Sequence, residues 1–128
     1  MHAILPATLE VYYSPACVPC RLELPVIAEF YHSDGRRVHI VILDQFERSR
    51  DDLRNVSEHL AETAIVSPTS NPRDALRKAG DSDGILPFAR SVTSDGKTCA
   101  SWRGELTLSR ARSLVAACVR KVTSPARR

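Results

Sequence analysis

The sequence has no long hydrophobic run, few cysteines and no strong excess of one charge. No apolar stretch approaches the ~18–20 residues needed to cross a membrane. The chain's 128 residues, 43% hydrophobic and 26% charged, fit one folded domain and exclude a mainly disordered or fibrous protein. Four cysteines are too sparse for a disulfide-stapled miniprotein, and a chain of this length buries its own core. The cysteines therefore need another explanation.

The charge balance argues against nucleic acid as a partner. There are 18 basic and 15 acidic residues, and the longest basic stretches are pairs, so no clustered basic stripe is present. The first residues also lack the charged region and the long apolar region of a signal peptide. Either the protein stays in the cytoplasm, or an export signal has been removed ahead of this sequence.

Hydrophobic spacing predicts strands that alternate with helices. Strands are predicted at 9–13, 38–43, 64–66, 88–92 and 98–102, and helices at 21–32, 51–60, 71–79 and 107–122. Pro25 lies inside the first helix, where it should cause a kink. The first strand–helix–strand run makes a right-handed crossover, so its two strands should be parallel. We expect one α/β domain over 1–128, with 123–128 as a disordered tail.

The motif Cys17-Val-Pro-Cys20 lies where the first strand meets the first helix. A thiolate at a helix N-terminus faces unpaired N–H groups and the positive end of the helix dipole, so its pKa can fall below ~8.5. Helical geometry brings Cys20 back toward Cys17 while burying it more deeply. We therefore expect Cys17 to attack a partner disulfide and Cys20 to resolve the mixed disulfide.

Other roles for the pair remain open. A zinc site needs two further ligands, and the remaining cysteines and histidines show no paired spacing, so we expect no metal ligands here. A structural disulfide that never turns over is another reading. A third is a soft-metal module in which Cys17 and Cys20 hold Cu(I). A fourth is a binding or adaptor module that docks partners without turnover.

The sequence resembles the thioredoxin superfamily, and more narrowly its TlpA/ResA-like thiol–disulfide oxidoreductases. The resemblance rests on residues 12–25, YYSPACVPCRLELP, and on 85–88, ILPF. It continues through the turn at 95–96 and through Gly104 before the last helix. The helix and strand between about 51 and 66 lie where TlpA-like proteins carry an insertion.

The resemblance implies a thioredoxin fold, with a central mixed sheet flanked by helices and a TlpA-like insertion. It implies a cis-proline at Pro87 that packs against the cysteine pair, and substrate contacts from Leu86, Pro87, Val18 and Pro19. It further implies a reductase of protein disulfides that needs no cofactor beyond its own dithiol and is fed by an upstream redox protein. We expect a periplasmic monomer, with any export signal or membrane anchor outside this chain.

Two departures from the family affect the chemistry. Ala16 stands where the family usually has tryptophan, which removes an apolar wall beside the motif. The buried acid of thioredoxins proper falls at Val11, so proton removal from Cys20 needs another base or water. Glu23 is a candidate base, although three residues past Cys20 it could equally be a solvated helix carboxylate.

The other two cysteines are harder to assign. Cys118 lies on the apolar stripe of the last helix, and Cys99 lies on the strand expected to pack near it. A Cys99–Cys118 disulfide is conceivable, but two buried thiols are the more ordinary outcome. Trp102 is interpreted as core or near-surface packing.

Overall fold

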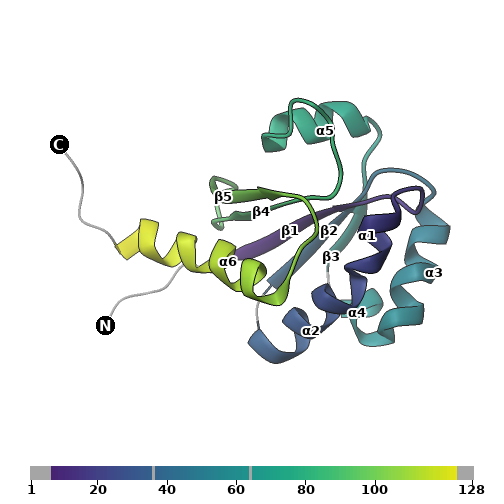
Figure 1. Cartoon of the computed structure of the whole chain (residues 1–128), viewed down its shortest axis with the longest axis horizontal. Helices are drawn as coiled ribbons and strands as arrows, with labels where there is room; N and C mark the ends of the chain where they lie inside the picture. The colour runs from purple at the N-terminus through teal and green to yellow at the C-terminus, as the bar shows by residue number, and fades with distance from the viewer. Residues whose placement is uncertain (1–6, 36, 64, 124–128) are drawn as a thin grey trace.

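The protein is a mixed sheet with helices on both faces (Figure 1). The computed structural model describes residues 7–35, 37–63 and 65–123. The strands are β1 (Thr8–Tyr13), β2 (Arg37–Ile42), β3 (Ile65–Pro68), β4 (Phe88–Val92) and β5 (Thr98–Arg103). The helices are α1 (Val18–Leu22), α2 (Leu24–Asp34), α3 (Phe46–Val56), α4 (Glu58–Thr63), α5 (Pro72–Ala79) and α6 (Leu108–Thr123). The predicted α/β class is confirmed. None of the described helices is long and apolar enough to span a membrane.

The described strands form one sheet in the order β3-β2-β1-β4-β5. β1, β2 and β3 run parallel, which confirms the predicted crossover, while β4 is antiparallel to β1 and β5 is antiparallel to β4. β1 is therefore the central strand, and the cysteine motif follows its carboxyl end. Of the predicted tail, 124–128 lie outside the described residues.

Side chains alternate across the sheet, so each face has its own core. On one face, Leu9, Val11 and Tyr13 of β1 pack in the same buried cluster as residues of α2, α3, α4 and α6. On the other face, Tyr12 belongs to a smaller cluster with α5 and Phe88. Figure 1 shows α5 on its own side of the sheet, with α2 and α6 on the opposite side.

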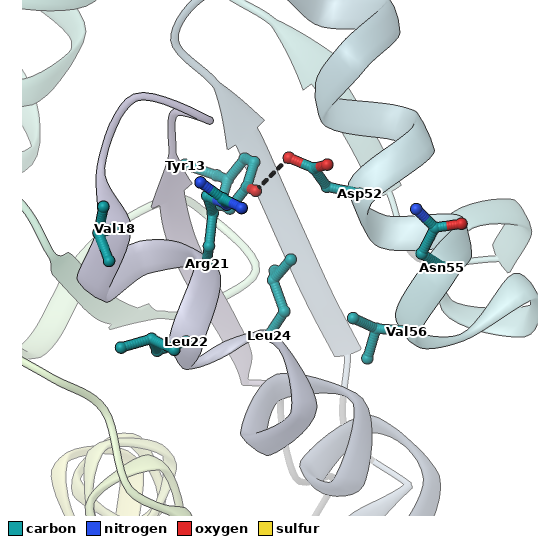
Figure 2. A pocket seen from close by; sticks show the side chains of 8 residues that line it. All are labelled: Tyr13, Val18, Arg21, Leu22, Leu24, Asp52, Asn55 and Val56. Carbon is teal, nitrogen blue, oxygen red and sulfur yellow. Dashed lines mark hydrogen bonds between the residues drawn. The ribbon is translucent and has the colours of Figure 1, made fainter.

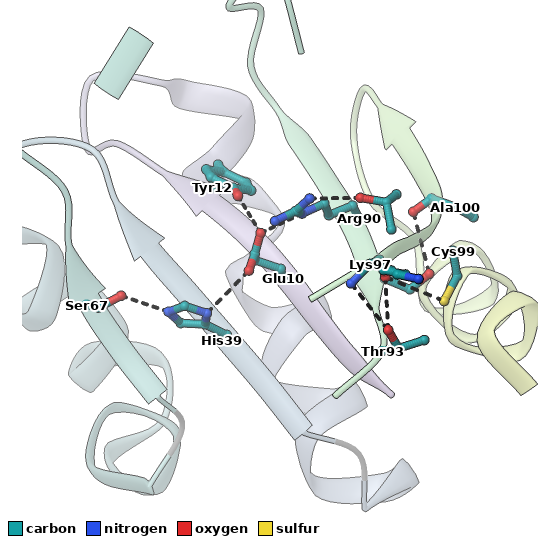
Figure 3. A network of polar contacts seen from close by, with 11 residues as sticks. Glu10, Tyr12, His39, Ser67, Arg90, Thr93, Lys97, Cys99 and Ala100 are labelled. Atoms are coloured by element: carbon teal, nitrogen blue, oxygen red, sulfur yellow. Dashed lines mark hydrogen bonds and ion pairs between the residues drawn. The ribbon is translucent and has the colours of Figure 1, made fainter. Parts of the chain in front are cut away.

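A buried carboxylate, Glu10, ties the central strands together on the α5 face (Figure 3). Arg90 on β4 donates to Glu10 at 2.7 Å, the ring of His39 on β2 lies 3.4 Å from it, and Tyr12 also donates to it. His39 continues to Ser67 on β3 at 2.7 Å. Burial alone would raise the pKa of Glu10, but its hydrogen bonds to His39, Tyr12 and Arg90 outweigh burial and lower the pKa to about 2.

Two predicted helices are each divided in the structure, and the first is divided beside Pro25, where a kink was predicted. The first predicted helix is two helices, α1 and α2, because Pro25 has no N–H to continue the hydrogen-bond ladder and its ring clashes with the preceding turn. The second, predicted over 51–60, is also two helices: α3 begins at Phe46, and extended Ser57 separates it from α4. Ser57 Oγ accepts from Leu60 N–H at 3.1 Å and so caps α4.

Candidate active site

A short turn after β1 positions the cysteine motif. Cys17 N–H donates to the Ser14 carbonyl at 3.1 Å, and Ser14 Oγ accepts from Ala16 N–H at 3.2 Å. Ser14 Oγ also donates to Asp44, which follows β2, at 2.7 Å. The turn is therefore anchored to the carboxyl ends of both central parallel strands.

Cys17 and Cys20 form a disulfide whose Cα atoms are 5.2 Å apart. Cys17 is the N-cap of α1, and its Sγ accepts from Cys20 N–H at 3.2 Å. Cys17 is partly exposed, whereas Cys20 is fully buried. Val18 and Pro19 between them are exposed, so the Cys17 side of the disulfide faces solvent. The pair therefore has an accessible outer sulfur and a protected inner one.

The second sequence motif forms the loop before β4. The Leu86–Pro87 peptide bond is cis, Pro87 is buried, and the Pro87 carbonyl accepts from Gly104 N–H at 2.9 Å. Leu86 and Cys17 both pack against the larger buried cluster. Leu86 and Ser14 line one pocket of about 560 Å³, which places the loop and the cysteine turn along the same end of the sheet.

Glu23 is buried, with 1% of its surface exposed, so the alternative of a solvated helix carboxylate is wrong. Its N–H donates to the Pro19 carbonyl at 3.2 Å, which closes the last turn of α1 and leaves Glu23 one turn beyond Cys20. Its carboxylate accepts from Leu106 N–H at 2.8 Å. Burial raises the pKa of Glu23 to about 7, against the opposing effect of the Leu106 hydrogen bond and with a smaller contribution from Glu105.

Sequence reasoning missed a polar pair beside α1. Tyr13 at the end of β1 donates to Asp52 of α3 at 2.7 Å. Burial and this bond raise the pKa of the Tyr13 phenol. The pairing joins positions far apart in the chain, and the only local signal for Asp52 was its place next to the core residue Leu53.

The remaining cysteines form a second disulfide, Cys99–Cys118, with Cα atoms 5.0 Å apart. The expectation of two buried thiols was wrong, because β5 and the buried stripe of α6 pack closely enough for a bridge. β5 runs in the same direction as β1, so Cys99 near its start lies at the opposite end of the sheet from Cys17. Trp102 on β5 is partly buried beneath Arg110, 3.9 Å from its ring centroid.

Comparisons with solved structures identify the architecture. A thioredoxin-related protein from Neisseria meningitidis serogroup B matches with a TM-score of 0.67 and 21% identity, over 89% of this chain and 85% of that one. The exposed lipoprotein thioredoxin Etrx1 of Streptococcus pneumoniae matches with a TM-score of 0.63 and 17% identity, over 88% and 85%. A secreted thiol–disulfide isomerase of Corynebacterium glutamicum matches with a TM-score of 0.59 and 16% identity, over 89% and 71%.

The chain has the thioredoxin fold. The resemblance to the superfamily seen in the sequence is thus confirmed at the level of the fold. No protein-family model and no curated protein matches the sequence. Within this fold, the cysteine pair lies at the start of the helix that follows the central strand, and the cis-proline lies directly before β4.

Proposed function

We propose that this protein is a thiol–disulfide oxidoreductase that reduces disulfides in other proteins. The observation that carries the proposal is the asymmetry of the cysteine pair: Cys17 is partly exposed at the start of α1, and Cys20 is fully buried one turn later. The Cys20 N–H that points at Cys17 Sγ, together with the helix dipole, stabilises a thiolate at Cys17. The thiolate is the reactive form.

The reaction is a two-step exchange. The Cys17 thiolate attacks one sulfur of the partner disulfide, forms a mixed disulfide and releases the partner's first thiolate. The Cys20 thiolate then attacks Cys17 Sγ, which closes the Cys17–Cys20 disulfide and releases the second partner thiolate. The partner gains two electrons and two protons in all. The dithiol is restored when an upstream redox protein reduces Cys17–Cys20 by the same steps in reverse.

Glu23 is proposed as the group that takes the proton from Cys20. Its carboxyl is buried one helical turn beyond Cys20, and a pKa of about 7 allows it to accept or return a proton at neutral pH. Val11, at the position where thioredoxins proper carry their buried acid, is a buried apolar residue and has no such capacity.

Leu86, Pro87, Val18 and Pro19 are proposed to contact the partner segment around its disulfide. Val18 and Pro19 are exposed beside Cys17, and Leu86 is half-buried at the edge of the adjacent pocket. We further propose that the protein acts as a monomer, without metal, added cofactor or nucleic acid. Its redox group is its own cysteine pair.

We propose the periplasm as its compartment, with any export signal or anchor outside this chain. The remote Cys99–Cys118 bridge supports this proposal, because disulfides away from a redox site persist mainly in oxidising compartments. Two of the matched structures are of a secreted thiol–disulfide isomerase and an exposed lipoprotein, which also favours a place outside the cytoplasm.

Insulin reduction tests the proposal. With dithiothreitol as the electron source, the protein should accelerate insulin precipitation, and Cys17→Ser should reduce the rate to the uncatalysed background. Cys99→Ala/Cys118→Ala is the matched control, since it also removes a disulfide but leaves the proposed site intact, and it should retain turnover. Equal rates for Cys17→Ser and the unmodified protein would contradict the proposal and favour an adaptor that docks partners without turnover.

A further inference from the structure

A pocket of about 290 Å³ opens between the cysteine helix α1 and the helix α3 (Figure 2). Val18, Arg21 and Leu22 of α1 form one side, and Asp52, Asn55 and Val56 of α3 form the other. Tyr13 and Leu24 complete the lining. Leu86 and Pro87 do not line it, so this pocket is separate from the one beside the cis-proline loop.

Three of the side chains that line this α1–α3 pocket are apolar and exposed. Val18 is 56% exposed, Leu22 64% and Val56 38%. Among the described residues only one other large hydrophobic side chain, Ile85, is comparably exposed. Clustered exposed apolar side chains in a folded protein mark an interaction surface more often than scattered ones do. These three side chains line one pocket, and Val18 directly follows Cys17, which points to a docking role.

The polar groups around the pocket show which charge the occupant should carry. Asp52 is already bonded to Tyr13, which fixes α3 against the end of β1. The Arg21 guanidinium is exposed and, within the described parts of the chain, makes no hydrogen bond or ion pair. The Asn55 side chain likewise has no hydrogen-bonding partner there. The rim thus carries both the Asp52 carboxylate and the Arg21 guanidinium, and of these two charges only Arg21 lacks a hydrogen-bonding partner among the described residues. An acidic group of the occupant can pair with it.

We infer that the α1–α3 pocket is a specificity site that holds one large apolar side chain of the disulfide-exchange partner, with an acidic residue beside it meeting Arg21. The inference rests on the proposed function and names the class of partner segment that it prefers. An apolar centre with a polar rim is the usual anatomy of a protein interface. Val18 directly follows Cys17, so the partner segment whose disulfide sulfur is attacked by Cys17 can continue into this pocket.

The location also gives the region around α3 a role. α3 supplies three of the eight lining residues, and without this helix the pocket would lose the wall that faces α1. Partner segments would then be selected on both sides of Cys17, by the cis-proline loop on one side and by α3 on the other.

Single-turnover exchange with short peptides tests the inference. The probes are serine- and alanine-based peptides whose one cysteine is joined to thionitrobenzoate, with a leucine moved through successive positions on either side of the cysteine. The pre-reduced protein should react about tenfold faster with the best leucine peptide than with the leucine-free peptide, as partial burial of one leucine predicts. A glutamate next to that leucine should add about threefold more.

Variants locate the effect. Leu22→Ser/Val56→Ser should abolish the leucine preference, and Arg21→Gln should abolish the glutamate gain. Arg37→Gln is the matched control, because Arg37 is also exposed and lies on β2 outside the pocket. Circular dichroism checks that each variant is folded, and the leucine-to-alanine rate ratio corrects for any change in cysteine reactivity.

The outcomes separate the two proposals. If the leucine-free peptide reacts no faster with the unmodified protein than with Cys17→Ser, the proposed function itself fails. If it reacts but no leucine position raises the rate more than about twofold, the pocket inference alone is overturned. A leucine preference that survives Leu22→Ser/Val56→Ser overturns it as well, because the side chain then binds elsewhere.

Discussion

At the scale of single residues, two buried carboxylates on opposite faces of the sheet have opposite pKa shifts. Glu10 is surrounded by Arg90, His39 and Tyr12, and these partners favour its charged form despite burial. Glu23 receives one backbone hydrogen bond, from Leu106, and burial dominates. Glu10 is thus suited to hold strands together, and Glu23 is suited to exchange a proton.

Glu23→Gln should therefore stabilise the protein at high pH. The pKa of Glu23 is about 7 in the folded state against an ordinary 4.5, so the folded state binds the proton more tightly than the unfolded state. The contribution of Glu23 to wild-type stability is therefore fully present below pH 4.5 and is lost as pH rises through 7. In the oxidised protein, the variant should gain about 3 kcal/mol relative to wild type between pH 5 and pH 8.

The same variant should lower insulin reduction about tenfold or more at neutral pH, because the amide cannot accept the Cys20 proton. Denaturant unfolding at several pH values and the insulin assay give the two readouts. Glu47→Gln, at an exposed carboxylate on α3, is the control and should change neither. A Glu23→Gln variant whose stability tracks wild type at all pH values would contradict the account of this residue.

At the scale of elements, the sequence located strands better than helix ends. A run of β-branched residues predicted β2, and the hairpin turn at 94–96 predicted β4, each to within a residue or so. The break between α3 and α4 at Ser57 could not be predicted from the sequence, because Leu53, Val56 and Leu60 keep helical spacing across it. Leu53 and Leu60 are buried, whereas Val56 is 38% exposed and lines the α1–α3 pocket.

The Cys99–Cys118 disulfide clips β5 to α6 and should contribute to stability rather than to turnover. It closes a loop with a sequence separation of 19 residues, and in the chain-entropy model such a loop stabilises by about 3 kcal/mol. Cys99→Ala/Cys118→Ala should therefore lower the free energy of unfolding by roughly that amount, measured by denaturant titration. An unchanged midpoint would show that the bridge is not formed in the folded protein.

At the scale of the whole molecule, the reactive motif was predictable because it is local in sequence. Cys17, Cys20 and Pro87 lie in short motifs whose chemistry follows from their neighbours. The environment of Glu23 was not predictable, because its burial depends on Leu106, 83 positions away. The α1–α3 pocket likewise depends on how two helices from different parts of the chain face each other.

The fold places its two disulfides at opposite ends of the sheet. One lies where β1 meets α1, with a partly exposed sulfur, and the other joins β5 to α6 at the far end of the sheet. Cys99 is partly exposed as well, so the two disulfides differ in place rather than in access. Cys17 is the N-cap of the helix that follows the central strand, whereas Cys99 lies within β5.

The most direct test is a glutathione redox titration of the Cys17–Cys20 couple, with thiols alkylated and counted by mass spectrometry. The account predicts one two-electron transition confined to Cys17 and Cys20, at a potential near the thioredoxin value of about −270 mV, while Cys99–Cys118 stays oxidised. A potential near about −120 mV would contradict the reductase and leave an oxidase. The absence of any transition at Cys17–Cys20 would contradict a redox-active pair altogether.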